Sequence, residues 1–108
     1  MDAWTKQTYD VFVSVLKRPR FSITILSEES KMSFNKQNFI VKFMHGSTTY
    51  ILSILENQGG SGVSCRSDDG VFKFKAGFSS KKSPSMRRTA IVMMKKIEHK
   101  EAYDVMMS

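Results

Sequence analysis

The chain is 108 residues long, 41% hydrophobic, and carries a net charge of +7. This length fits one domain with one modest core, so we expect a single domain over residues 1–108. No apolar run approaches the roughly 20 residues that a membrane-spanning helix needs, and the start lacks the pattern of a secretory signal. The composition therefore indicates an intracellular protein, cytoplasmic or nuclear, that does not contact membranes.

The positive charge is concentrated in one segment. Residues 73–100 contain nine Lys or Arg and one acidic residue, whereas residues 1–72 hold eight basic and seven acidic residues. A local excess of this size favours a polyanionic partner, and nucleic acid is the first candidate. A basic face that is simply solvated is the alternative.

Few residues could support catalysis or bind a metal. Cys65 has no second cysteine to pair with, and with only His45 and His99 beside it no structural zinc site is expected. The acidic pairs at 28–29 and 68–69 fall in loop-like sequence with no neighbouring histidine. We therefore expect no enzymatic activity, no cofactor and no small-molecule substrate.

Residues 5–16 carry two competing patterns. Tyr9, Phe12 and Leu16 recur as on one face of a helix, whereas the three valines between positions 11 and 15 alternate as in a strand. Basic residues followed by Pro19 are typical of a helix end, and on that ground we predict a helix.

Strand-like segments fill the middle of the chain. Their composition and alternation predict strands over residues 21–27, 38–44, 48–55 and 71–78, and one short edge strand over residues 63–66. The polar stretch 28–36 indicates a loop, and residues 45–47 indicate a tight turn that joins a hairpin. In the segment 71–78, Phe72 and Phe74 alternate with Lys73 and Lys75, which places the aromatic rings and the lysines on opposite faces.

An amphipathic helix is predicted from Pro84 to Ile97, with Ser83 as its cap. Its apolar residues recur at helical spacing: Met86, Ala90, Met93, Met94 and Ile97. The basic residues off that stripe are Arg87, Arg88, Lys95 and Lys96. We expect the methionines of this region, including Met106 and Met107, to fill the core.

These elements predict an α+β fold. We expect an antiparallel sheet of three or more strands, with the N-terminal helix and the C-terminal amphipathic helix packed on one face, in the order α-β-β-β-α.

The region 71–97 resembles the last strand and second helix of double-stranded RNA-binding domains. The resemblance is carried by the strand Phe72-Lys73-Phe74-Lys75-Ala76-Gly77, by Ser80-Lys81-Lys82, and by the apolar helix after it. The chain departs from that family at Ser83-Pro84-Ser85, where a third lysine and small residues are usual, and in the long segment 50–70, which leaves room for an extra pair of strands.

This resemblance implies a protein that binds duplex RNA through shape and phosphate contacts, without sequence specificity. Lys81 and Lys82 would clamp phosphates at the start of a helix, and Arg87 and Arg88 would assist them. The weaker contacts implied are Lys6, Gln7 and Asp10 on the first helix and Ser33 and Asn35 in the loop before the second strand. Such a domain would suit a viral suppressor of RNA silencing.

Two other interpretations stay open. If residues 9–16 form a strand, the chain resembles single-strand-binding proteins such as the transcriptional coactivator PC4 or the Whirly family. Tyr50, Phe72 and Phe74 would then stack on bases, with Lys73 and Lys75 as phosphate contacts. The other interpretation is a protein-interaction module or homodimer, which would use an exposed edge at 59–66 and the tail that contains Met106 and Met107.

Overall fold

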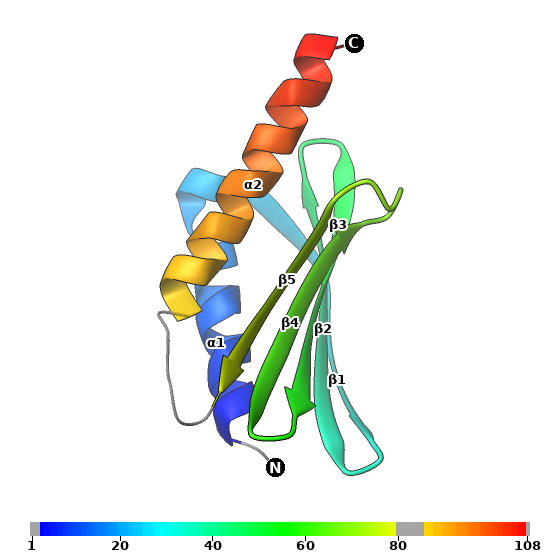
Figure 1. The fold of residues 1–108 in the computed structure, drawn as a ribbon. Coiled ribbons are helices and arrows are strands. Elements are labelled where there is room, and N and C mark those ends of the chain that lie inside the picture. Colours follow the sequence, from blue (N-terminus) through cyan, green and yellow to red (C-terminus); the bar gives the residue numbers. More distant parts are fainter. Residues whose placement is uncertain (1–2, 80–85, 108) are drawn as a thin grey trace.

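The structure, a computed structural model, describes residues 3–79 and 86–107. Its elements are α1 (Ala3–Leu16), a short 3-10 helix (Pro19–Phe21), β1 (Ile23–Ser33), β2 (Lys36–His45), β3 (Thr48–Asn57), β4 (Gly60–Ser67), β5 (Lys73–Ser79) and α2 (Met86–Met107). The five strands form one antiparallel sheet in chain order, and both helices lie on the same side of it (Figure 1). The predicted α+β fold is therefore confirmed, with five strands between the helices.

The first segment is helical because the helix buries the larger side chains. Phe12, Val15 and Leu16 are at most 1% exposed, which is the spacing of one helical face. The amide of Lys17 still bonds to the carbonyl of Val13, and the chain then turns at Pro19, which cannot continue the ladder. The predicted helix is confirmed, and the strand that the single-strand-binding interpretation needs at residues 9–16 is not formed.

The sheet is built from tight hairpins. The predicted loop at 28–36 is wrong, because β1 continues to Ser33 and a two-residue turn at Phe34 and Asn35, both with positive φ, leads into β2. The outer half of β1 is exposed on both faces, so its polar composition follows from its position at the end of a hairpin. Pairing with β2 specifies it as a strand.

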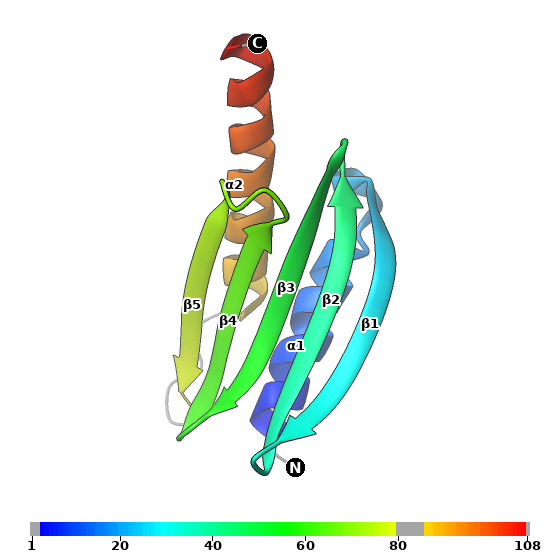
Figure 2. The same cartoon turned by 90° about the vertical axis from the view of Figure 1, so that its right-hand side faces the viewer.

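The predicted edge strand at 63–66 is part of β4, which is longer and not at an edge. β4 pairs with β3 on one side and with β5 on the other, so it is an interior strand (Figure 2). The segment 50–70 thus holds the end of β3 and the whole of β4, the extra strands for which the sequence leaves room.

The core lies between the sheet and the two helices. The helix-facing side chains of the central strands are buried: Phe39, Val41, Phe43, Tyr50, Leu52, Ile54, Val63 and Cys65. The apolar stripe predicted for the last helix is buried in full: Met86, Ala90, Met93, Met94 and Ile97. Met106 and Met107, predicted to fill the core, are instead 82% and 69% exposed, because the end of α2 extends beyond the sheet (Figure 1).

Glu101 fastens α2 to the hairpin between β2 and β3 beyond this apolar stripe. Its Oε2 atom accepts a hydrogen bond of 2.5 Å from the Tyr50 hydroxyl and lies 2.9 Å from Nδ1 of His45. Burial raises the pKa of the Tyr50 hydroxyl, and the bond to Glu101 adds to the shift.

Among the described residues, neither helix is long and apolar enough to cross a bilayer.

Candidate nucleic-acid interface

The residues predicted to make the main phosphate contacts are only partly among those that the structure describes. Lys81 and Lys82, with the predicted cap Ser83 and Pro84, lie outside the described residues. Arg87, which follows in the first turn of α2, is exposed, and so is Arg88. The lysine clamp therefore stays a prediction, while its two predicted helpers lie on a described helix.

The weaker predicted contacts lie on α1 and at the tip of the first hairpin. Lys6, Gln7 and Asp10 are exposed on α1, and Nζ of Lys6 lies 2.6 Å from Asp10, so these two charges largely neutralise each other. Ser33 and Asn35 are exposed at the β1–β2 turn. Both places can be reached by a ligand, but neither carries a net concentration of positive charge.

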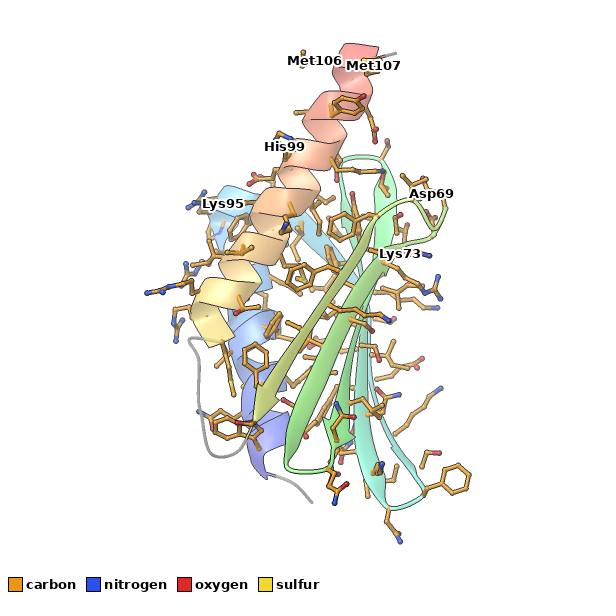
Figure 3. All side chains as sticks on the ribbon, in the orientation of Figure 1. Asp69, Lys73, Lys95, His99, Met106 and Met107 are labelled. Atoms are coloured by element: carbon orange, nitrogen blue, oxygen red, sulfur yellow. The ribbon has the colours of Figure 1, made fainter. Side chains whose placement is uncertain are left out.

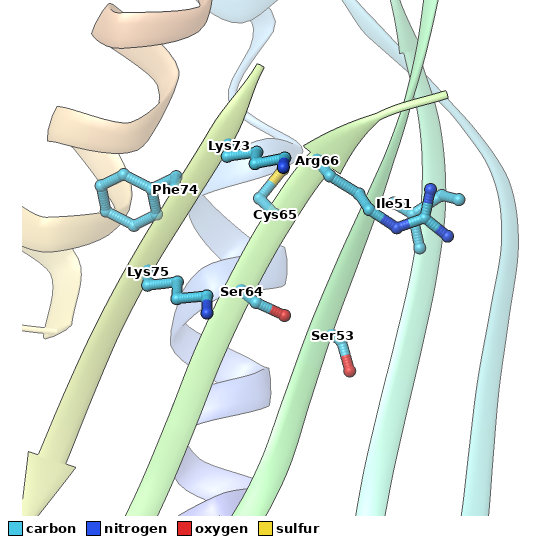
Figure 4. A pocket seen from close by; sticks show the side chains of 8 residues that line it. All are labelled: Ile51, Ser53, Ser64, Cys65, Arg66, Lys73, Phe74 and Lys75. Carbon is cyan, nitrogen blue, oxygen red and sulfur yellow. The ribbon is translucent and has the colours of Figure 1, made fainter. Parts of the chain in front are cut away.

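Lys73 and Lys75 lie on β5, and their side chains point away from the helices. The ring of Phe74, between them in sequence, lies on the α2 side of the strand (Figure 4). The alternation predicted for this strand is confirmed. It also separates the predicted binding residues, because Lys73 and Lys75 are on the open side of the sheet, whereas Arg87 and Arg88 belong to a helix on the other side.

The aromatic residues proposed as stacking platforms are not available to bases. Tyr50 is fully buried and Phe72 is 7% exposed, and their rings meet edge to face with centroids 5.7 Å apart. Phe74 is half-buried against the core. All three belong to the layer between sheet and helices, so the stacking roles assigned to them are wrong.

A groove between the start of β5 and α2 is lined by three lysines of α2 and by Lys73 of β5, whose side chain leans toward the open side of the sheet (Figure 4). It has a volume of about 540 Å³ and is lined by Phe72, Lys73, Val92, Lys95, Lys96, His99 and Lys100. Figure 3 marks Lys73 on β5 and Lys95 and His99 on α2. We refer to this groove as the β5–α2 groove. Four of its seven lining residues are lysines and none is acidic.

The exposed charges of this part of α2 are mainly basic, and Glu98, the acid among them in sequence, is half-buried and does not line the groove. Lys95, Lys96 and His99 are exposed on the side opposite the buried stripe, whereas Glu101 is turned toward the sheet and held by Tyr50 and His45. In the described part of the chain, no acidic oxygen lies within 4.0 Å of the Lys95 or Lys96 ammonium. Their positive charge is therefore not neutralised locally.

One lysine of the groove is paired. Nζ of Lys100 lies 3.0 Å from Asp104, and this hydrogen bond raises the pKa of the lysine. Nearby, the carboxyl of Asp69 accepts hydrogen bonds from the Ser67 hydroxyl and the Val71 amide, which lower its pKa. Both acids lie outside the groove lining, so they lessen its positive charge without removing it.

Sequence reasoning only partly found this groove. The helical pattern places Lys95 and Lys96 off the apolar stripe, but it assigns neither of them, nor Lys100, to a binding site. The available signal was their helical spacing from Val92, which places them on one exposed side. The partner strand could not be read from that spacing.

A nucleophilic role for Cys65 would require an ionisable thiol and a neighbouring base, for which His45 and His99 are the histidines of the chain. The Cys65 side chain is 2% exposed, and burial raises the pKa of the thiol from 9.0 to about 12. The thiol is therefore neutral at physiological pH. His45, one candidate base, lies beside Glu101 instead.

We expect Cys65 to be unreactive toward Ellman's reagent in the folded protein at pH 8, where the thiolate fraction is about a thousandfold below that of an ordinary thiol. One equivalent of thiol should react after denaturation in guanidinium. Because the folded pKa exceeds the unfolded one, the stability contribution of this thiol is complete below pH 9 and declines as the pH rises toward 12. Rapid reaction of the native protein would contradict the buried position.

Comparisons of the chain with models of protein families, with characterised proteins and with solved structures gave no match. The arrangement of residues described above is accordingly the basis on which a function can be argued.

Proposed function

We propose that this protein binds double-stranded RNA through phosphate contacts, without reading the base sequence. The observation that carries the proposal is the β5–α2 groove, whose lining holds four lysines and no acid. Side-chain ammonium groups that are not neutralised locally attract the phosphate backbone, which supplies most of the affinity in binding without sequence specificity.

The choice of a duplex over a single strand rests on where the aromatic residues lie. Proteins that bind single strands combine a basic groove with exposed rings on which bases stack. Phe72, which lines the groove, is 7% exposed, and Tyr50 beside it is fully buried. The exposed rings of Phe34 and Tyr103 lie outside the groove lining. A duplex keeps its bases paired inside and presents only its phosphates, so it suits this surface better than a single strand does.

The choice of RNA over DNA rests on the resemblance of residues 71–97 to double-stranded RNA-binding domains. In an A-form duplex the major groove is too narrow for side chains, so phosphates on either side of it are the accessible targets. The predicted clamp, Lys81 and Lys82, directly precedes α2 in the sequence, and the groove extends the positive surface along the same helix.

Affinity measured for duplex RNA, duplex DNA and single strands at two salt concentrations tests the proposal. If each of the three α2 lysines of the groove contacts one phosphate, they alone give a slope of log K against log salt of about −2.7, so binding should weaken at least roughly 40-fold between 50 and 200 mM salt. We expect duplex RNA to bind most tightly. Affinity that does not respond to salt, or no binding at low salt, would contradict a nucleic-acid function.

A protein-interaction role has one observation in its favour. The last turn of α2 exposes Val105, Met106 and Met107, each at least 69% exposed. The other surface expected for that role, an edge at 59–66, does not exist, because β4 is paired on both sides. Absence of RNA binding at low salt would favour this second role.

A further inference from the structure

The open face of the sheet, which is the side away from both helices, carries a second group of basic residues. In one row across four neighbouring strands, Lys42 pairs with Ile51, Ile51 with Arg66, and Arg66 with Lys73. In the next row Ser53 pairs with Ser64, and Ser64 with Lys75. Directly paired residues have Cβ atoms about 5 Å apart, so these side chains are immediate neighbours.

Like charges meet in this arrangement. Arg66 stands directly opposite Lys73, a cross-strand combination that destabilises a sheet unless an anion compensates it. Within residues 3–79 and 86–107, the side chains of Arg66, Lys73 and Lys75 make no ion pair with an acidic group. The positive potential on this part of the sheet is thus not compensated by the protein itself.

A pocket of about 310 Å³ lies among these cations (Figure 4). The small side chains of Ser53 and Ser64 leave it hollow. Lys73 and Lys75 lean from β5 across β4, and Arg66 leans in the same direction, from β4 over β3 toward Ile51. The Ser53 hydroxyl bonds to Asn38, whereas the Ser64 hydroxyl has no partner among the described residues.

We propose that this pocket binds a phosphate group, held by Arg66, Lys73 and Lys75 together with the Ser64 hydroxyl. A guanidinium and two ammonium groups supply the charge-assisted hydrogen bonds that a phosphate prefers, and the serine hydroxyl can donate another. The one aromatic lining residue, Phe74, turns its ring toward α2, so the site recognises the phosphate and not a base.

Lys73 connects this pocket with the β5–α2 groove, since it lines both. A strand that leaves a duplex bound in the groove can pass the edge strand β5 and present its terminal phosphate to the pocket. A strand end as the source of the phosphate depends on the proposed function, because it requires that the protein binds a duplex. A small phosphorylated molecule is the other source, and it requires no duplex.

The pocket is tested first with inorganic phosphate, titrated into the full ¹⁵N-labelled chain and followed by amide chemical shifts. We expect saturable shifts at Ser64, Arg66 and Lys75. They should disappear in the double variant Arg66→Gln/Lys75→Gln and persist in Lys17→Gln/Lys31→Gln, which loses the same charge from exposed lysines elsewhere. Absence of saturable shifts, or equal shifts in both variants, would overturn the phosphate site.

The source is tested with one RNA duplex prepared with 5′-phosphate ends and with 5′-hydroxyl ends. We expect the phosphorylated duplex to bind roughly tenfold more tightly, as one well-bonded charged group does, and this preference to vanish in Arg66→Gln/Lys75→Gln. Equal affinity for the two duplexes, with the phosphate shifts intact, would overturn the strand-end source and support a small phosphorylated ligand. Phosphate shifts without any duplex binding would support the pocket and contradict the proposed function.

Discussion

Replacement of Lys95, Lys96 and Lys100 together by glutamine is expected to flatten the salt dependence of duplex RNA binding. Each lysine that contacts a phosphate contributes about 0.9 to the slope, so the loss of three should reduce its magnitude by about 2.7. Between 50 and 200 mM salt, the variant should therefore lose roughly 40-fold less affinity than the natural protein. Fluorescence anisotropy with a labelled duplex measures both slopes, and binding at 50 mM salt should be clearly weaker in the variant.

The fold should survive this triple change. The three lysines lie outside the buried stripe, and glutamine is a good helix former. The one ion pair that is lost joins Lys100 to Asp104, whose carboxyl is 52% exposed, so its loss leaves no buried charge without a partner. The matched control is Lys17, Lys31 and Lys42 replaced by glutamine, which removes the same charge from residues that do not line the groove. Equal flattening in both variants would show that net charge, and not the groove, governs binding.

The sequence was informative about elements whose side chains repeat strictly. The buried stripe from Met86 to Ile97 and the alternation of Phe74 with Lys73 and Lys75 both reflect a single period, and both were confirmed. The segment 28–36 was misread because the outer end of a hairpin buries neither face, so β1 has no alternation there to detect. Its strand geometry is imposed by pairing with β2, which a local pattern does not contain.

The candidate site was less predictable because it is assembled from residues distant in sequence. The charge count identifies the basic region, but Lys73 and Lys96 line one groove only because α2 crosses beside the start of β5. The phosphate pocket depends in the same way on register, since Arg66 and Lys73 are opposed only in one pairing of β4 with β5. Spacing along the chain can assign a residue to a face, but it cannot say which strand or helix lies next to that face.

Replacement of Ile97 by alanine is expected to be strongly destabilising. Ile97 is fully buried where α2 crosses the core, so its truncation should lower the free energy of unfolding by about 2–5 kcal/mol. In a chain of this size that corresponds to a fall in Tm of roughly 10–25 °C. Val92→Ala is the matched control, because Val92 is on the same helix, 40% exposed, and should change stability by no more than about 0.5 kcal/mol.

The Ile97→Ala variant also separates stability from binding. Ile97 holds α2 against the sheet but does not line the groove, so at a temperature where Ile97→Ala is still folded its affinity for duplex RNA should match that of the natural protein within about twofold. On heating, binding should be lost together with the circular dichroism signal, since the groove exists only while α2 is docked on β5. Unfolding curves that coincide for both variants would contradict the burial of Ile97. Binding that persists through the unfolding of α2 would show that the charge of the basic segment is sufficient and that its arrangement around the groove is not required.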